Sequence, residues 1–347
     1  MRLLPPVLKN KEKIAMKHNT VRWIAAVLLL LALAAGLSCP SIVEAEETVK
    51  LPMDFTKGGV KTDKEKWTYD GKTPVAYSDS TIEVTSEKSS VTAKVKGKSV
   101  KHEVWVIRIK IQDASQLRTA VSKDTYNGRG QAKGEDIAKS KNAVVAMNGD
   151  FFKYENDVGY VVRQAEFIRD ATDTSRKKKG QPICFDMLVV DNEGDFYIVP
   201  HARTKEIEEF IETTLTPEGR TVMDTFNLGP ALVIDGEVQD IASSQAAQQG
   251  DYQWNYPQQR IALVQTGHLE YAIVEVFGQT DSTAGLTLEE FANLIAEKVP
   301  DAKIAYNFDG GGSTNLILNN KKICKTPGLR EITDIIYFAS AEGYIEE

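Results

Sequence analysis

Three consecutive glycines near the C-terminus, Gly310, Gly311 and Gly312, force the chain to turn sharply between two apolar segments. Residues 302–308 alternate in polarity and are apolar enough to form a strand, and residues 315–318 are typical of the next strand. Glycine loses more backbone entropy on ordering than any other residue, so three in a row weaken any strand or helix that contains them. We therefore expect a connection between buried elements in which bare backbone is needed.

Asp309 precedes this turn and is expected to lie where a sheet ends. Backbone N–H groups exposed by such a turn can bind an anionic oxygen, with Ser313 and Thr314 as additional donors. A simple glycine-rich bend explains the turn equally well. A Walker loop is excluded, because no Gly-Lys-Ser or Gly-Lys-Thr follows and no helix is predicted after the glycines.

The N-terminus has the pattern of an export signal. Basic residues precede an apolar run at 23–37, which is shorter than the roughly 20 residues needed to span a bilayer. Cleavage after Ala45 fits the small-x-small rule, so residues 1–45 are predicted to be a signal peptide, with Met16 as an alternative start. Lipidation at Cys39 and an uncleaved anchor are the alternatives. We expect a secreted or envelope-associated protein that contacts a membrane only through this signal or anchor.

The composition of the rest of the chain limits its domain organisation and its kinds of partner. Residues 46–70 are polar and predict a flexible leader, and residues 71–347 predict one large domain. The net charge of −7 argues against a nucleic-acid partner, because binding phosphates requires a basic face. His102, His201 and His268 lack the spacing of metal ligands, so a histidine-based zinc site is not expected.

Cys184 and Cys324 are the only cysteines that remain after cleavage at Ala45. Two cysteines are too few for a disulfide framework, so the core must supply the stability. Pairing requires Cα atoms within roughly 7 Å, and nothing in the sequence brings the two segments together. We therefore expect free thiols rather than a disulfide.

Short segments that are alternating or, at 143–147, fully apolar dominate the domain and predict strands. They lie at 81–85, 90–95, 104–111, 143–147, 159–163, 185–190, 196–199, 257–264 and 271–277. Helices are predicted at 136–140, at 207–213 and after Thr287, where a capping box with Glu290 opens an apolar stripe. The last helix feeds into the strand before Asp309. The fold class predicted is α+β, with mixed, mostly antiparallel sheets and a few packed helices.

A second unusual segment, Asn-Gly-Asp-Phe-Phe at 148–152, follows the buried strand 143–147. Asn148 and Asp150 would lie at the edge of a sheet, with Phe151 and Phe152 as an apolar wall or as a stacking surface for a sugar. The alternative is a turn whose phenylalanines belong to the core, because Asn-Gly is a common turn signal. Arg163 ends the strand 159–163 and is interpreted as a surface charge or as a bidentate phosphate ligand.

Seven motifs in this order resemble the phosphodiester glycosidase family. They are Asn-Gly-Asp-Phe-Phe at 148–152, Gly-Tyr-Val-Val-Arg at 159–163, Gly-Pro-Ala-Leu-Val at 229–233, Arg260 before Ile-Ala-Leu, Gly-Leu-Thr-Leu-Glu-Glu at 285–290, Asn-Phe-Asp-Gly-Gly-Gly-Ser-Thr at 307–314 and Arg-Glu-Ile-Thr-Asp-Ile-Ile at 330–336. The resemblance covers residues 70–347 and implies a mixed α+β fold and hydrolysis of sugar-phosphate diesters. The chain departs from the family pattern at 277–279, where Phe-Gly-Gln replaces Asp-Gly-Arg.

The residue types suit this chemistry. Cleavage at an anomeric carbon needs an acid or nucleophile and donors for the departing phosphate, and two carboxylates generally share the first task. The predicted catalytic residues are Asp309, Asp150 and Arg260. The predicted substrate-binding residues are Asn148, Phe151, Phe152, Arg163, Gly229, Gly310, Gly311, Gly312, Ser313, Thr314 and Arg330.

No cofactor is required by these motifs, although the carboxylates of Asp309 and Asp150 leave a calcium or magnesium ion open. We expect a secreted hydrolase of sugar-1-phosphate diesters in envelope or extracellular glycans. Two alternatives remain at this point. The loss of Asp-Gly-Arg favours a non-catalytic glycan binder, and a metal site would favour a phosphodiesterase that cleaves the P–O bond.

Overall fold

The computed structural model describes residues 48–54, 56–126, 130–149, 159–171, 177–178, 181–182, 186–200, 202–227, 229–243, 254–278, 284–323 and 328–345. All of them belong to one compact unit, Thr48–Glu347. The predicted signal peptide, the two cysteines at 184 and 324, and the predicted site residues Asp150, Phe151 and Phe152 lie outside the described residues. Among the described helices, none is long and apolar enough to cross a membrane.

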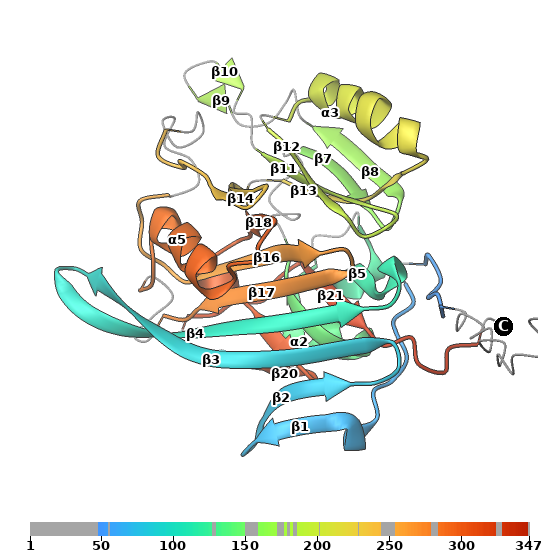
Figure 1. The fold of residues 1–347 in the computed structure, drawn as a ribbon, viewed down its shortest axis with the longest axis horizontal. Coiled ribbons are helices and arrows are strands. Elements are labelled where there is room, and N and C mark those ends of the chain that lie inside the picture. Colours follow the sequence, from blue (N-terminus) through green and yellow to red (C-terminus); the bar gives the residue numbers. More distant parts are fainter. Residues whose placement is uncertain are drawn as a thin grey trace, which may run out of the picture. The chain divides into compact units, whose positions relative to one another are not determined.

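A nine-stranded sheet forms the centre of the unit (Figure 1), in the order β1-β2-β3-β4-β17-β16-β18-β14-β15. The strands are β1 Trp67–Asp70, β2 Thr73–Ser78, β3 Ile82–Val95, β4 Lys98–Ile111, β14 Ala231–Ile234, β15 Glu237–Val238, β16 Arg260–Gly267, β17 Glu270–Val276 and β18 Ile304–Asn307. β17 and β18 are each antiparallel to β16, so they run parallel to each other. Helix α5, Leu288–Lys298, connects them, and the predicted capping box of Thr287 and Glu290 forms its start.

A five-stranded sheet packs on one face of the large sheet. Its order is β20-β19-β6-β21-β5, with β5 Leu117–Val121, β6 Ala143–Asn148, β19 Leu316–Leu318, β20 Lys321–Lys322 and β21 Asp334–Ala339. Side chains that alternate along the strands of this small sheet point to its two faces and belong to two different hydrophobic cores. Val145 and Met147 pack with Ile107 and Leu263 of the large sheet, whereas Ala146 packs with Ile137 on the outer side.

Two helices cover the outer faces of the two sheets. Ile137 belongs to α2, Gly134–Ser140, which covers the five-stranded sheet. Phe291 and Ile295 of α5 pack on Ala262 and Val274 of the nine-stranded sheet. The layers therefore run helix, large sheet, small sheet, helix, and the largest core lies between the two sheets.

The remaining elements form smaller groups around a three-stranded sheet of order β12-β11-β13. They are β7 Gly159–Arg163, β8 Glu166–Ala171, β9 Lys177–Lys178, β10 Gln181–Pro182, β11 Met187–Asp191, β12 Phe196–Val199, β13 Val222–Phe226, α3 Thr204–Phe210, a π-helix Ile211–Leu215, and 3-10 turns Lys64–Lys66, Ala114–Gln116, Ser122–Asp124, Thr216–Glu218 and Gly311–Ser313. Every strand pairing in the described part of the chain is antiparallel. The α+β prediction is confirmed in its broad form, with sheets predominating over helices.

Residues 48–70 correct the prediction of a flexible leader at 46–70. Leu51 is buried, and the carbonyl oxygens of Pro52 and Asp54 accept hydrogen bonds from Arg118 at 2.9 and 3.0 Å. Lys141, also buried, donates to the carbonyl oxygen of Thr56 at 2.6 Å. Two buried cations thus use the backbone of this segment as their acceptors, because unpaired charges are costly in the interior. The polar composition of this segment gave no indication that its backbone accepts hydrogen bonds from buried side chains.

Candidate active site

The glycine turn joins the two sheets rather than two strands of one sheet. β18 of the large sheet leads into the turn, and β19 of the small sheet follows it. Asn148 ends β6 in the small sheet, whereas Arg260 begins β16 in the large one. From the sequence, Asp309 and Asn148 were each expected at the end or edge of a sheet, and the strands that they follow belong to different sheets. Asp309 follows β18 and precedes β19, so it belongs to the segment in which the chain passes from one sheet to the other.

Close packing on both sides explains the three glycines. A Cβ added at Gly310 would lie 2.6 Å from the carbonyl oxygen of Gln259, and one at Gly312 would lie 2.9 Å from that of Gly328. Gly311 has φ of +58°, a left-handed conformation that side chains disfavour. The turn therefore needs glycine at each position for a steric reason.

The amides of the turn are used inside the protein. Gly311 donates to the carbonyl oxygen of Gln259 at 3.0 Å, and Ser313 and Thr314 donate back to Gly310 and Gly311 at 3.2 and 3.3 Å. The Thr314 hydroxyl also donates to the Gly311 carbonyl, at 3.0 Å. These three amides are therefore bonded to main-chain carbonyls. The backbone of Gly310 is hydrogen-bonded to the Asp309 carboxylate, so the turn binds the anionic oxygen of its own aspartate.

Asp309 and Arg330 are the exposed part of the site. An Nη of Arg330 lies 3.4 Å from a carboxylate oxygen of Asp309, and its Nε donates to Ser313 Oγ at 2.9 Å. The Asp309 side chain is 15% exposed and that of Arg330 48% exposed. Burial raises the pKa of Asp309 to about 6, although Ser313 and Arg330 act in the opposite direction. A carboxyl that titrates near neutrality beside a half-exposed guanidinium is an arrangement suited to catalysis.

Asn148 fixes both ends of the turn. Its Nδ2 donates to the carbonyl oxygen of Asp309 at 2.9 Å, and its Oδ1 accepts from the amide of Asn315 at 3.0 Å. The side chain is almost fully buried. One amide group of the small sheet thus sets the position of the backbone that carries Asp309.

Arg260 is buried behind the turn. Its Nε donates to the carbonyl oxygen of Leu286 at 3.1 Å and one Nη to that of Tyr256 at 2.8 Å. Burial lowers its pKa to about 9, while the charge of Asp309 acts to raise it. The guanidinium stays charged at neutral pH, and these contacts tie the segments before β16 and before α5 to the same point.

Gln259 was not predicted from the sequence, where two consecutive glutamines give no signal. Its side chain is fully buried, and its Nε2 donates to the carbonyl oxygen of Gly311 at 3.0 Å. Its Oε1 accepts from the amide of Gly278 at 2.9 Å. Gln259 therefore joins the glycine turn to the end of β17, the place where this chain departs from the Asp-Gly-Arg pattern.

Arg163 lies in the interior, so the interpretation as a surface charge is wrong. Its guanidinium donates to the carbonyl oxygens of Val162 and Thr225, lies 4.6 Å from the centre of the Phe226 ring and approaches an Asp334 oxygen to 3.7 Å. Asp334 was also missed, although it is the one carboxylate in the apolar strand β21.

Asp334 and Gly229 place two further motifs against the site. A Cβ at Gly149 would lie 2.2 Å from an Asp334 oxygen, so the Asn148 turn packs directly on this carboxylate. Gly229 has φ of +57°, and its carbonyl oxygen accepts from Asn307 Nδ2 at 2.8 Å, next to the strand that leads to Asp309. Together with the contact between Arg163 and Asp334, these contacts bring residues from five of the seven motifs into one neighbourhood.

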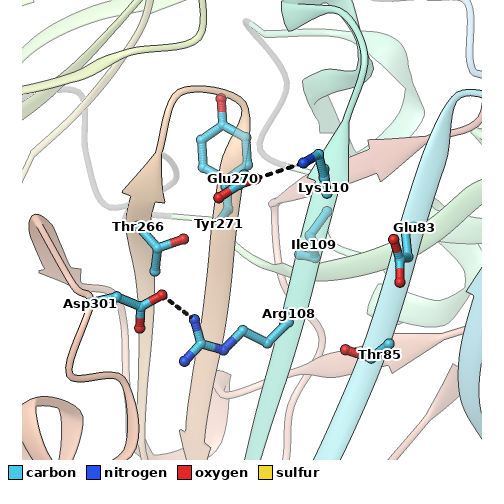
Figure 2. Close-up of a pocket in the computed structure, with 9 residues that line it drawn as sticks. All are labelled: Glu83, Thr85, Arg108, Ile109, Lys110, Thr266, Glu270, Tyr271 and Asp301. Atoms are coloured by element: carbon cyan, nitrogen blue, oxygen red, sulfur yellow. Dashed lines mark hydrogen bonds and ion pairs between the residues drawn. The ribbon is translucent and has the colours of Figure 1, made fainter.

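A pocket of about 200 Å³ lies elsewhere on the large sheet, as Figure 2 shows. Its lining residues are Glu83, Thr85, Arg108, Ile109, Lys110, Thr266, Glu270, Tyr271 and Asp301. Arg108 pairs with Asp301 at 2.6 Å and Lys110 with Glu270 at 2.8 Å. β16 runs from Arg260 to this pocket, a distance of roughly 20 Å for eight residues. The pocket and the Asp309 site are therefore at opposite ends of the sheet.

Within the part of the chain that the structure describes, no three His, Cys, Asp or Glu side chains lie close enough together to hold a metal ion. Asp150, which the sequence offers as a partner of Asp309, lies outside that part.

Comparison with known proteins gives a family and a fold. The model of the phosphodiester glycosidase family matches residues 141–339. The catalytic domain of zebrafish N-acetylglucosamine-1-phosphodiester alpha-N-acetylglucosaminidase, auto-inhibited by its pro-peptide, is similar in structure, with a TM-score of 0.55 and 14% identity over 85% of this chain and 99% of that chain. At this identity the similarity shows the fold alone.

Two bacterial structures are similar at a lower level. A hypothetical protein from Synechocystis has a TM-score of 0.46 and 16% identity, covering 74% of this chain and 62% of that chain. A putative exported protein from Burkholderia pseudomallei has a TM-score of 0.43 and 14% identity, covering 69% of this chain and 74% of that one. No curated protein matches the sequence.

Proposed function

Because this chain belongs to the phosphodiester glycosidase family, we propose that it is an exported hydrolase of sugar-1-phosphate diesters in envelope or extracellular glycans. The observation that carries the proposal is Asp309, a carboxyl with a pKa of about 6 held between two sheets beside Arg330. Family membership supplies the reaction class. The geometry supplies the residues to which the steps are assigned.

The reaction needs negative charge at the anomeric carbon and positive charge at the phosphate. Phosphate departs without needing a proton, so charge stabilisation matters more than general acid catalysis. Ionised Asp309 is the group proposed to act at the anomeric carbon. Arg330 is proposed to bind the departing phosphate, since a guanidinium matches phosphate oxygens in a bidentate manner. Asp150 is the second carboxylate that the sequence offers for this pair.

The buried residues around the turn have a positioning role in this proposal. Asn148 holds the Asp309 carbonyl, Gln259 holds the Gly311 carbonyl, and Ser313 accepts from Arg330 Nε. These bonds fix the direction of the two charged side chains before a substrate binds. Preorganisation of this kind lowers the barrier because no reorganisation is needed during the reaction.

Export is proposed from the N-terminal sequence, with its basic residues, apolar run and cleavage site at Ala45. Protein that begins at Glu46 is the form to assay. It is expected to release free sugar from a nucleotide-sugar or from a synthetic sugar-phosphate diester.

Labelled water tests the bond that is cleaved. Hydrolysis in oxygen-18 water is expected to place the label in the released sugar, because the attack occurs at the anomeric carbon. Label in the phosphate would contradict the proposal and select a phosphodiesterase. Tight binding of wall-glycan fragments in calorimetry, with no sugar released, would select a glycan-binding protein instead.

A further inference from the structure

The hairpin of β3 and β4 extends beyond the sheet to which it belongs. β2 pairs with β3 at Glu83–Thr85, and β17 pairs with β4 at Val104–Lys110. In the described part of the chain, residues 90–95 and 98–103 pair only with each other, from Ser90 with Glu103 to Val95 with Lys98. Figure 1 shows this ribbon, in cyan, projecting past the neighbouring strands. We refer to residues 90–103 as the lysine arm.

The lysine arm is basic in a chain whose net charge is −7. It carries four exposed lysines, Lys94, Lys96, Lys98 and Lys101, and no acidic residue lies between Glu87 and Glu103. Glu103 pairs with Lys88, at the base of the arm. Among the described residues, none of the four lysines forms an ion pair. Four uncompensated cations on a narrow ribbon repel one another, so an anionic partner would stabilise the arm.

The arm begins at the end of the sheet where Asp309 lies. Val104 pairs with Val276, and Val276 pairs with Arg260. The amide of Phe277 donates to the carbonyl oxygen of Glu103 at 2.9 Å, and the next residue, Gly278, donates to Gln259. Gln259 in turn holds the glycine turn. A continuous set of hydrogen bonds therefore joins the base of the arm to the candidate active site.

The two faces of the arm differ. Val91 and Ala93 pack with the α5 core, and Val100 shares their face. Lys94 and Lys101 alternate onto the opposite face. That face continues the side of β4 that carries Trp105 and Ile107, which pack toward the small sheet. Lys94 and Lys101 thus lie on the side of the large sheet where Asn148 and the glycine turn are found, whereas Lys98, which pairs with Val95, shares the face of Val100.

The length of the lysine arm determines whether a polymer or a small ligand can contact both the arm and Asp309. From Val104 to the arm's turn at Lys96 and Gly97 the strand advances roughly 23 Å, at about 3.3 Å for each residue. A single sugar-phosphate diester bound at Asp309 cannot reach the lysines at that turn. A chain with a phosphate in every repeat can contact both at once.

We propose that the lysine arm binds a poly-phosphodiester glycan and guides it to the Asp309 site, so that the substrate is a polymer rather than a small diester. This inference rests on the proposed function for the substrate class. The binding itself depends on charge and is measured without turnover. An anionic lipid surface is the competing partner, and the experiment is arranged to separate the two.

The test uses fluorescent poly(glycerol phosphate) of about ten repeats and protein from Glu46 onward that carries Asp309→Asn. The arm variant replaces Lys94, Lys96, Lys98 and Lys101 by Gln. The matched control makes the same replacement at exposed lysines outside the arm, Lys61, Lys64, Lys72 and Lys205. Both variants change the net charge equally, so a difference between their affinities for the polymer depends on where the replaced lysines lie.

We expect the arm variant to bind the polymer at least about tenfold more weakly at 50 mM salt, and the slope of log affinity against log salt to fall by about 3, since each phosphate contact contributes roughly 0.7. The control variant is expected to change the affinity for the polymer less than about twofold. When Asp309 is left unchanged, the protein with the four arm lysines replaced is expected to cleave a small diester at the parent rate. Intermediate loss is expected for Lys94→Gln with Lys101→Gln alone.

Three outcomes would overturn the inference: unchanged polymer binding by the arm variant, an equal loss in the control, or tighter binding to phosphatidylglycerol vesicles than to the polymer. The failure of the proposed function has a different signature. In that case the protein releases no sugar from any diester, whereas arm-dependent polymer binding by the Asp309→Asn protein is unaffected.

Discussion

Two aspartate–arginine pairs lie at opposite ends of the nine-stranded sheet and behave in opposite ways. Asp301 pairs with Arg108 at 2.6 Å at the pocket end (Figure 2), and Asp309 pairs with Arg330 at 3.4 Å at the glycine turn. The Arg108 hydrogen bond lowers the pKa of Asp301. Burial raises the pKa of Asp309 to about 6. The closer pair is therefore the one whose carboxyl has a lowered pKa.

The solvent exposure of the two aspartate side chains explains why their pKa values shift in opposite directions. The Asp301 side chain is 53% exposed and that of Asp309 15% exposed, so water stabilises the charge of the first and hardly that of the second. A pocket with exposed, mutually paired charges is typical of a solvated surface. A carboxyl whose charge is only partly compensated stores free energy that a substrate can use. The two ends can be compared directly by matched substitutions.

The largest difference is expected in activity. Asp309→Asn removes the charge proposed to act at the anomeric carbon and should lower kcat/KM for a sugar-phosphate diester by at least about 10³-fold. Asp301→Asn should change it less than about twofold, because Asp301 lies roughly 20 Å away. Initial rates of sugar release measure both. An Asp309→Asn protein with the parent rate would remove Asp309 from the mechanism.

The pH dependence of the parent enzyme is the next largest effect. If ionised Asp309 is the reactive form, kcat/KM rises about tenfold per pH unit below pH 6 and levels off above it. Phosphate needs no proton to depart, which is why the ionised form is expected. Rates measured between pH 4 and pH 8 check the sign. A rate that falls as pH rises through 6 would assign Asp309 as the acid instead.

Stability should change in the direction opposite to activity. The folded pKa of Asp309 lies above its ordinary value of 3.8, so its contribution to stability is fully present below about pH 4 and is lost as pH rises through about 6. Asp309→Asn should therefore raise the free energy of unfolding at pH 7 by up to about 3 kcal/mol relative to its effect at pH 4. Urea unfolding at both pH values measures this. Buried Asp224, whose pKa burial also raises to about 6, titrates in both proteins and cancels from the difference.

The smallest effect is expected at the pocket end. The lowered pKa of Asp301 means that its contribution is present above its ordinary pKa and is lost as pH falls. Asp301→Asn should lower the free energy of unfolding at pH 7 by only a few tenths of a kcal/mol, because solvent screens an exposed pair. The same urea titrations decide it. A loss as large as the gain at Asp309 would show that exposure does not separate the two ends.

Local pattern was enough to predict much of the fold. Alternation in Val-Trp-Val-Ile-Arg-Ile-Lys-Ile predicted the strand at 104–111, and the Thr287 capping box predicted α5. Pairing across the chain was not predicted, because alternation specifies which face of a strand is apolar but not which sheet it joins. The turn at 310–312 was therefore predicted as a connection between buried elements, but not as a connection between two sheets.

Residues of the candidate site could be predicted where their type differs from that of their sequence neighbours. Asp309 stands out beside three glycines, whereas Gln259 lies among polar residues and acts through two main-chain bonds that no sequence pattern reveals. A surface charge was one of the two interpretations of Arg163, because arginine is rarely buried alone. Its burial depends on Asp334, far away in sequence, so only the tertiary structure could show it.

Because the turn that carries Asp309 is also the covalent link between the two sheets, the alignment of the sheets sets the position of the carboxylate. A small slip of one sheet over the other would displace Asp309 from Arg330 while leaving most of the core intact. Heat should therefore inactivate the protein at a lower temperature than the one at which it unfolds. Substitutions that loosen the core between the sheets, such as Met147→Ala, should widen that interval, which makes activity a sensitive gauge of sheet packing.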